Sequence, residues 1–110
     1  MMDLRAYREV VKTAVARERA ADKNWGWSVK AVNKGTVRIG WGYLDYIGCD
    51  DTLDLTVFNE DDLTVVTATA PNGHREHVFV GDTRWDDAKT IDEAIGIAVH
   101  AAATYMHSVY

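Results

Sequence analysis

The chain has 110 residues, 47% of them hydrophobic, and 12 Lys and Arg against 17 Asp and Glu give it a formal net charge of −5. A chain of this length buries roughly 60 to 70% of its unfolded surface, so we expect one core and a single domain over residues 1–110. The negative charge disfavours direct nucleic-acid binding, and the sequence lacks the run of roughly 20 apolar residues that would span a membrane.

Cysteine content and the first residues predict a cytoplasmic protein. Cys49 is the only cysteine, so no disulfide can form within the chain. The start of the sequence lacks the apolar run of a secretory signal. A bias towards Asp and Ala over Glu and Ile is typical of high-GC genomes, and we expect a gene carried by a phage or another mobile element, with the protein in the host cytoplasm.

The first expected element is an amphipathic helix from Asp3 to about Asp22, because apolar residues recur there at helical spacing between charged ones. Large apolar side chains then alternate with small or polar ones from Trp25 to Ala31, which is the period of a half-buried strand. The turn-forming residues 33–35 separate this strand from a second, which begins at Thr36 and is expected to end near Ile47 and Gly48. The two strands are predicted to form a hairpin.

Three more strands are predicted. The segment Thr52–Phe58 alternates with its odd-numbered residues inward, and residues 59–62 form a polar turn after it. The segments Leu63–Ala70 and His74–Val80 flank Pro71–Gly73, an arrangement typical of a hairpin. Together the five strands favour a meander.

A second helix is predicted to begin at Thr90, because Glu93 follows three residues later as in a capping box. Its expected buried stripe consists of Ile91, Ile95, Ala98, Ala102, Tyr105 and Val109. No connection between strands is long enough for a parallel crossover. We therefore predict an α+β fold in which an N-terminal helix, a five-stranded mainly antiparallel meander sheet and a C-terminal helix follow one another, with both helices on one face of the sheet and the other face in solvent.

The histidines do not have the spacing of metal ligands. His74 and His77 would point to opposite faces of a strand, and His100 and His107 lie two turns apart on a helix instead of at the i, i+4 spacing of a zinc pair. We expect no metal site.

No motif for catalysis or for a cofactor is present either. Carboxylates follow Cys49 and would raise the pKa of its thiol, which makes it a poor nucleophile. Gly40 and Gly42 lie in an expected strand, whereas dinucleotide binding needs glycines in a loop that opens a helix. Two small residues on one face instead predict close approach of another group to the sheet. No catalytic residue and no cofactor is therefore predicted.

Charge is distributed unevenly along the chain. No Lys or Arg occurs between Arg38 and Arg75, whereas the first helix is rich in basic residues. Acidic residues of this interval, together with nearby aromatic ones, form the predicted partner-binding surface. Its members are Asp45, Asp50, Asp51, Asp54, Phe58, Glu60, Asp61, Asp62 and Trp85.

A compact acidic domain without a reaction centre is best interpreted as a non-enzymatic protein that binds a host protein with a basic surface and regulates or inhibits it. The carboxylates would accelerate the encounter, and the aromatic side chains would supply the short-range binding energy. One alternative is a nucleic-acid mimic that inhibits a DNA- or RNA-binding or defence enzyme. Another is a small-ligand-binding protein or enzyme with a pocket between sheet and helices, where Tyr43, His77 or His100 would be polar contacts. The edges of an open sheet would also allow a homodimer.

Overall fold

The computed structural model describes residues 3–21, 25–43, 50–60, 63–81 and 87–109, and it confirms the predicted order of helix, five strands and helix. A short 3-10 helix, η1 (Leu4–Tyr7), continues into α1 (Arg8–Ala21), and α2 (Ile91–Val109) is the second helix. The strands are β1 (Trp25–Val32), β2 (Thr36–Tyr43), β3 (Asp50–Glu60), β4 (Leu63–Thr69) and β5 (Arg75–Val80).

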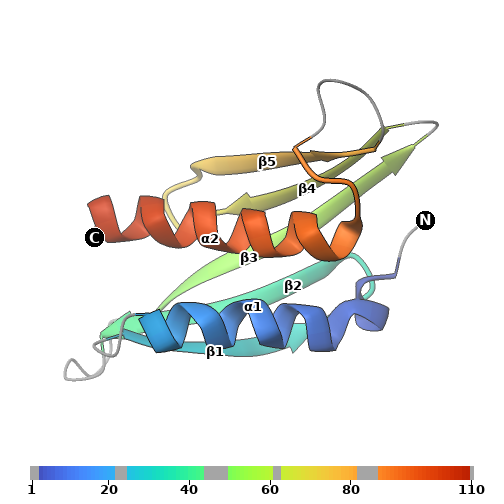
Figure 1. Cartoon of the computed structure of the whole chain (residues 1–110). Helices are drawn as coiled ribbons and strands as arrows, with labels where there is room; N and C mark the ends of the chain where they lie inside the picture. Colours follow the sequence, from blue (N-terminus) through green and yellow to red (C-terminus); the bar gives the residue numbers. More distant parts are fainter. Residues whose placement is uncertain (1–2, 22–24, 44–49, 61–62, 82–86, 110) are drawn as a thin grey trace.

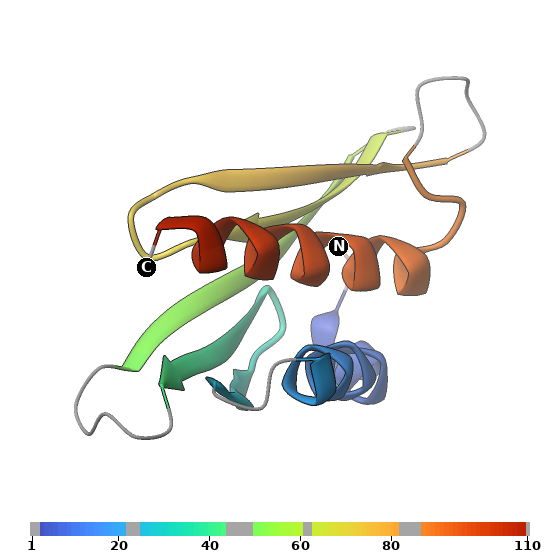
Figure 2. The same ribbon diagram turned by 60° about the vertical axis from the view of Figure 1, so that its left-hand side comes forward.

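The sheet has the order β1-β2-β3-β4-β5, and each strand pairs antiparallel with the next. Both helices pack on the same face of this sheet, as predicted (Figure 1). The sheet is strongly twisted, with β1 and β5 as its two edges (Figure 2). Among the described residues no helix is both long and apolar enough to cross a membrane.

Polar side chains mark the start of each helical segment. Asp3 precedes η1, and its carboxylate accepts hydrogen bonds from the side chain and the backbone N of Arg5, which lower the pKa of Asp3 to about 2. At the start of α2 the Thr90 hydroxyl accepts a hydrogen bond of 3.1 Å from the backbone N of Glu93. This bond satisfies one of the unpaired donors of the first turn, as the capping pattern predicts.

The core lies between the sheet and the two helices. The sheet supplies mainly the odd-numbered residues of β2 and β3, and α2 supplies a largely alanine surface that lets the helix lie close to the strands. Trp27 and Trp41 are buried as expected, with ring centroids 5.8 Å apart, while the side chain of Trp25 lies outside the described part of the structure. The predicted burial of Val109 is wrong, because this residue lies in the final turn of α2 and is 51% exposed.

The edge strand β1 contains an irregularity that includes a lysine. Its register with β2 shifts between Val29 and Ala31, so Lys30 is the extra residue of a bulge. The side chain of Lys30 lies over Gly40, where a Cβ would collide with the lysine stem. The sequence predicted that another group lies close to the sheet at Gly40, and this group is the side chain of Lys30 in the same chain. Bulges and lysines on an edge discourage pairing with another sheet.

The other edge is covered over part of its length. The backbone N atoms of Asp87 and Ala88 donate to the carbonyl of Phe79 at 3.0 and 3.1 Å. This segment occupies the outer side of β5 at Phe79 and Val80. The predicted homodimer through a sheet edge remains a prediction, and these features restrict it to the remaining parts of the edges.

Replacing Leu55, which is 1% exposed, by alanine should lower the free energy of unfolding by about 2–5 kcal/mol, because it leaves a cavity in the core. Its neighbour Thr56 points to the opposite face, so Thr56→Ala should cost less than about 1 kcal/mol. Urea denaturation of both variants measures the difference. Equal losses would contradict a core on one side of the sheet only.

Candidate functional site

The face of the sheet opposite the helices, called the open face below, is organised in rows across β3, β4 and β5. The register places even-numbered residues of β3 beside odd-numbered residues of β4 and β5 on this face. The rows are Phe58, Val65 and Phe79, then Thr56, Thr67 and His77, then Asp54, Thr69 and Arg75. The open face therefore changes from apolar through hydroxyl-bearing to charged along the strands.

The apolar end of the open face forms an exposed patch of Phe58, Leu63, Val65 and Phe79, called the apolar patch below. Phe58 is 50% exposed, Leu63 46% and Phe79 41%, whereas Val65, between the two phenylalanines, is 8% exposed. Leu63 shares the face of Val65 because it lies two residues earlier in the same strand. Three of the five large hydrophobic side chains exposed in the described residues thus gather here. Contiguous apolar surface of this kind marks contacts with other molecules.

Two carboxylates of the described residues border the apolar patch. Glu60 is exposed and shares the face of Phe58, two residues earlier in β3. Asp87 is also exposed, and its Oδ2 accepts a hydrogen bond of 3.2 Å from the backbone N of Phe79. The patch therefore has acidic neighbours at the ends of two strands.

The structure distributes the other predicted acidic residues over two faces. Asp54 lies on the open face, where its Oδ1 is 3.0 Å from Nε of Arg38 in the neighbouring strand, and this bond raises the pKa of Arg38. Asp50 has the strand position of the open face, although its side chain is not among those described. Asp51 pairs with Trp41 and so has the position of the helix-covered face. Of the predicted surface, Phe58 and Glu60 are brought together, and the charge of Asp54 is offset by an arginine.

The remaining members of the predicted surface, Asp45, Asp61, Asp62 and Trp85, lie outside the described residues. Asp61 and Asp62 connect β3 to β4 in the sequence, next to Glu60 and Leu63. Their role, like that of the whole surface, stays a prediction.

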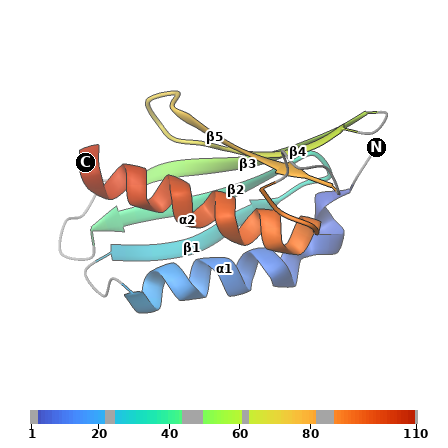
Figure 3. The same ribbon diagram turned by 45° about the horizontal axis from the view of Figure 1, so that its top comes forward.

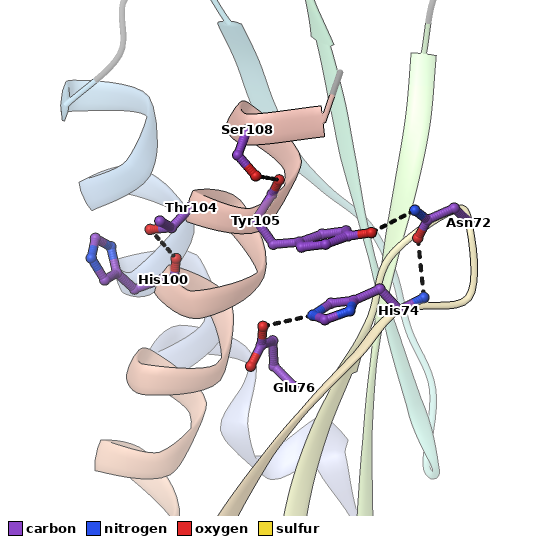
Figure 4. Close-up of polar contacts among 7 residues, drawn as sticks. All are labelled: Asn72, His74, Glu76, His100, Thr104, Tyr105 and Ser108. Carbon is purple, nitrogen blue, oxygen red and sulfur yellow. Dashed lines mark hydrogen bonds and ion pairs between the residues drawn. The ribbon is translucent and has the colours of Figure 1, made fainter.

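A polar cluster that was not predicted joins the β4–β5 turn to α2 (Figure 4). The imidazole of His74 stacks on the ring of Tyr105, with centroids 3.6 Å apart and planes at 9°, and its Nε2 lies 2.7 Å from Oε1 of Glu76. The amide of Asn72 donates to the Tyr105 hydroxyl at 2.7 Å and accepts from the backbone N of His74 at 3.0 Å. The i, i+2 spacing of His74 and Glu76 gives a sequence signal for their pair. The contact with Tyr105 gives none, because β5 and most of α2 separate the two segments in the sequence.

A histidine beside a carboxylate and a tyrosine is a combination used in acid–base catalysis. Here the polar atoms bond one another, and neither of the two grooves beside α1 is lined by these residues. We therefore assign the cluster a structural role, in which it holds the β4–β5 turn against α2.

The other histidines do not converge on one site. His77 lies on the open face with Nδ1 2.9 Å from the Thr67 hydroxyl, so it points away from His74. His100 lies on the helix side, 2.9 Å from Oε1 of Glu18. Within the described residues no group of three or more metal-ligating side chains is placed to hold an ion.

Two open grooves lie beside α1. One, of about 410 Å³, runs between α1 and α2, and its lining residues are Glu9, Val10, Thr13, Ala14, Arg17, Asp92, Glu93 and Gly96. The other, of about 440 Å³, runs between α1 and β1, and its lining residues are Lys12, Thr13, Val15, Ala16, Arg19, Trp27, Ser28 and Val29. Neither is lined by His77 or His100, two of the polar contacts expected for a small-ligand pocket, and the side chain of Tyr43, the third, is not described.

Loss of the Tyr105 hydroxyl should weaken the attachment of the β4–β5 turn. Tyr105→Phe should lower the free energy of unfolding by about 0.5–1.5 kcal/mol, and in an Asn72→Ala background the same change should cost close to nothing, because the donor is already absent. A double-mutant cycle in urea measures this coupling. Ser108→Ala, which removes a hydroxyl that donates to the Tyr105 carbonyl, is the control and should remain additive with Asn72→Ala. Additive costs for Tyr105→Phe and Asn72→Ala would show that the hydrogen bond contributes nothing.

Comparison of the chain with protein-family models, with curated proteins and with solved structures finds no match. Similarity to known proteins therefore supplies neither a family nor a partner. Function has to be inferred from the surfaces of the molecule itself.

Proposed function

We propose that this chain is a non-enzymatic binding protein that docks on a partner protein through the open face of its sheet and thereby regulates or inhibits that partner. The observation that supports the proposal is the apolar patch of Phe58, Leu63, Val65 and Phe79 on a face that no described helix covers.

The patch has the properties of an interface anchor. Aromatic side chains dominate the energetics of protein interfaces, and full burial of one is worth roughly 1.5–3 kcal/mol. Phe58 and Phe79 are held on paired strands, one on either side of Val65, so little backbone freedom is lost when a partner covers them.

The charges around the patch favour a partner with a basic surface. Glu60 and Asp87 border the patch, and the whole chain carries a net charge of −5. A partner whose apolar spot is surrounded by Lys or Arg would be attracted over a distance of about a Debye length and then held by the aromatic contacts.

Nucleic-acid mimicry is less well supported by the open face. Mimicry needs carboxylates in a row without cations between them, whereas Arg38 is bonded to Asp54 and Arg75 lies in the same cross-strand row. The arrangement favours docking through apolar contacts with an acidic border.

The patch proposal predicts that a Phe58→Ser/Phe79→Ser variant binds its partner at least about tenfold more weakly, because two anchors are lost. A photo-crosslinking residue at position 58 identifies the partner in a host lysate, and titration calorimetry with the purified partner measures the affinity. Ile97→Ser is the control, since Ile97 is another large hydrophobic side chain, 37% exposed, but lies on α2. The proposal fails if the double variant retains wild-type affinity, or if Ile97→Ser weakens binding as much.

The charge proposal predicts that Glu60→Gln slows association with the same partner by about two- to fivefold at low salt and leaves dissociation nearly unchanged. Asp51→Asn removes the same charge from the helix-covered face and should leave both rates unchanged. Stopped-flow measurements at several salt concentrations separate the two rates. An equal effect of both substitutions would point to net charge alone, and a steep linear loss of log affinity with log salt would favour the mimic instead.

A further inference from the structure

A second surface, with chemistry opposite to that of the apolar patch, lies along the other edge of the sheet. This is the groove of about 440 Å³ between α1 and β1, called the edge groove below. Since β1 is the first strand in the sheet order, its outer backbone N–H and C=O groups face no other strand of the described residues. Figure 3 shows α1 running alongside β1 at this edge.

The edge groove combines an apolar floor with basic side chains. Val15 and Trp27, both nearly fully buried, form part of its lining. Lys12 and Arg19 line it from α1, and seven residues on a helix correspond to a separation of about 10.5 Å along the axis. Lys12 is 3.7 Å from the exposed carboxylate of Glu9, whereas Arg19 has no carboxylate partner among the described residues.

The part of β1 beside the groove is regular enough to pair. The bulge at Lys30 interrupts the register after Val29, and the segment Trp25–Val29 before it follows an uninterrupted antiparallel register with β2. Ser28 and Val29 of this segment line the groove together with Trp27. An extended chain of about five residues would match the free side of this segment.

From the free strand edge and the two cations beside it, we infer that the edge groove binds an acidic peptide segment in extended conformation, which adds to β1 as a sixth strand. Strand addition supplies main-chain hydrogen bonds, and side chains on alternate positions supply the specificity. Alternate residues of such a strand face the helix layer at intervals of about 6.6 Å. Two carboxylates at that interval come within reach of the flexible side chains of Lys12 and Arg19.

A second copy of the chain fits the groove less well than an acidic peptide. Pairing β1 with β1 of another molecule would bring the two α1 helices together, with Lys12 and Arg19 of both copies on the facing sides. The cations would repel one another, whereas a negatively charged strand is attracted. This inference does not depend on the apolar patch, which lies at β3–β5.

The test uses the full chain, labelled with ¹⁵N, and a capped octapeptide of alternating aspartate and valine as the probe. Amide shifts at residues 27–29 and a fitted Kd report binding at β1. A peptide with lysine in place of aspartate should not bind, and N-methylation of alternate peptide amides should abolish binding because the main-chain donors are lost.

Substitutions on α1 then locate the site. Arg19→Glu should weaken peptide binding at least about tenfold, since an attractive charge becomes a repulsive one. Arg17→Glu makes the same change two residues earlier, in the lining of the other groove, and should leave the Kd unchanged.

Three outcomes would overturn the inference. Equal effects of Arg19→Glu and Arg17→Glu would reduce it to non-specific attraction, and unimpaired binding of the N-methylated peptide would exclude strand addition. A dimer in sedimentation experiments whose amides at residues 27–29 resist hydrogen exchange would assign the edge to a second copy.

Discussion

Both helices pack on one face of the sheet, and this arrangement decides which side chains each face carries. The helices come from opposite ends of the chain and contact each other as well as the strands. Small residues make this possible: the buried surface of α2 includes Ala94, Ala98, Ala102 and Ala103. At the border between the helices, Oε1 of Glu18 meets Nδ1 of His100 at 2.9 Å, so the contact is apolar inside and polar outside.

Because one face takes both helices, the other must be stable in water. Most of the open face meets this requirement with threonines and charged residues, such as the row of Thr56, Thr67 and His77. The row of Phe58, Val65 and Phe79 departs from it, but its members also shelter one another, as the 8% exposure of Val65 shows. Cross-strand pairs of this type stabilise a sheet by about 0.2–1 kcal/mol each. The row can therefore persist in the unbound protein and still offer its outer surface to a partner.

Much of the fold could be predicted from the sequence because its signals are local. The period of two in the strands, the period of 3.6 in the helices and the capping pattern at Thr90 each depend on neighbouring residues. The ends of the strands were harder to predict. We expect β3 over Thr52–Phe58 from the sequence, but it extends from Asp50 to Glu60, because pairing with β2 and β4 overrides the low strand propensity of its ends. Likewise His74, expected in a strand, lies just before β5 and directly after Gly73, which has a φ of 92°.

The candidate site was harder to predict because it depends on pairing between strands. The acidic residues were grouped by proximity in sequence, but alternation places Asp50 and Asp51 on opposite faces, and the arginine that offsets Asp54 comes from the neighbouring strand. Phe58 was predicted, whereas Leu63 and Phe79 were missed. That both side chains point outward follows from the alternation within their own strands. That they lie beside Phe58 depends on the register between the strands, which turn lengths and tertiary packing determine.

The apolar patch and the edge groove differ in geometry as well as in charge. This difference disfavours contact between the patch of one copy and the groove of another. An acidic-bordered patch and a basic groove on one molecule attract each other between copies, but attraction alone gives no stable contact. The edge groove requires a chain with unpaired backbone groups, whereas Phe58, Val65 and Phe79 lie on strands whose central member, β4, is paired on both sides. The patch of one copy presents side chains and no extended segment with free backbone groups, so it lacks the chemistry that the proposed peptide would bring to the edge groove of another.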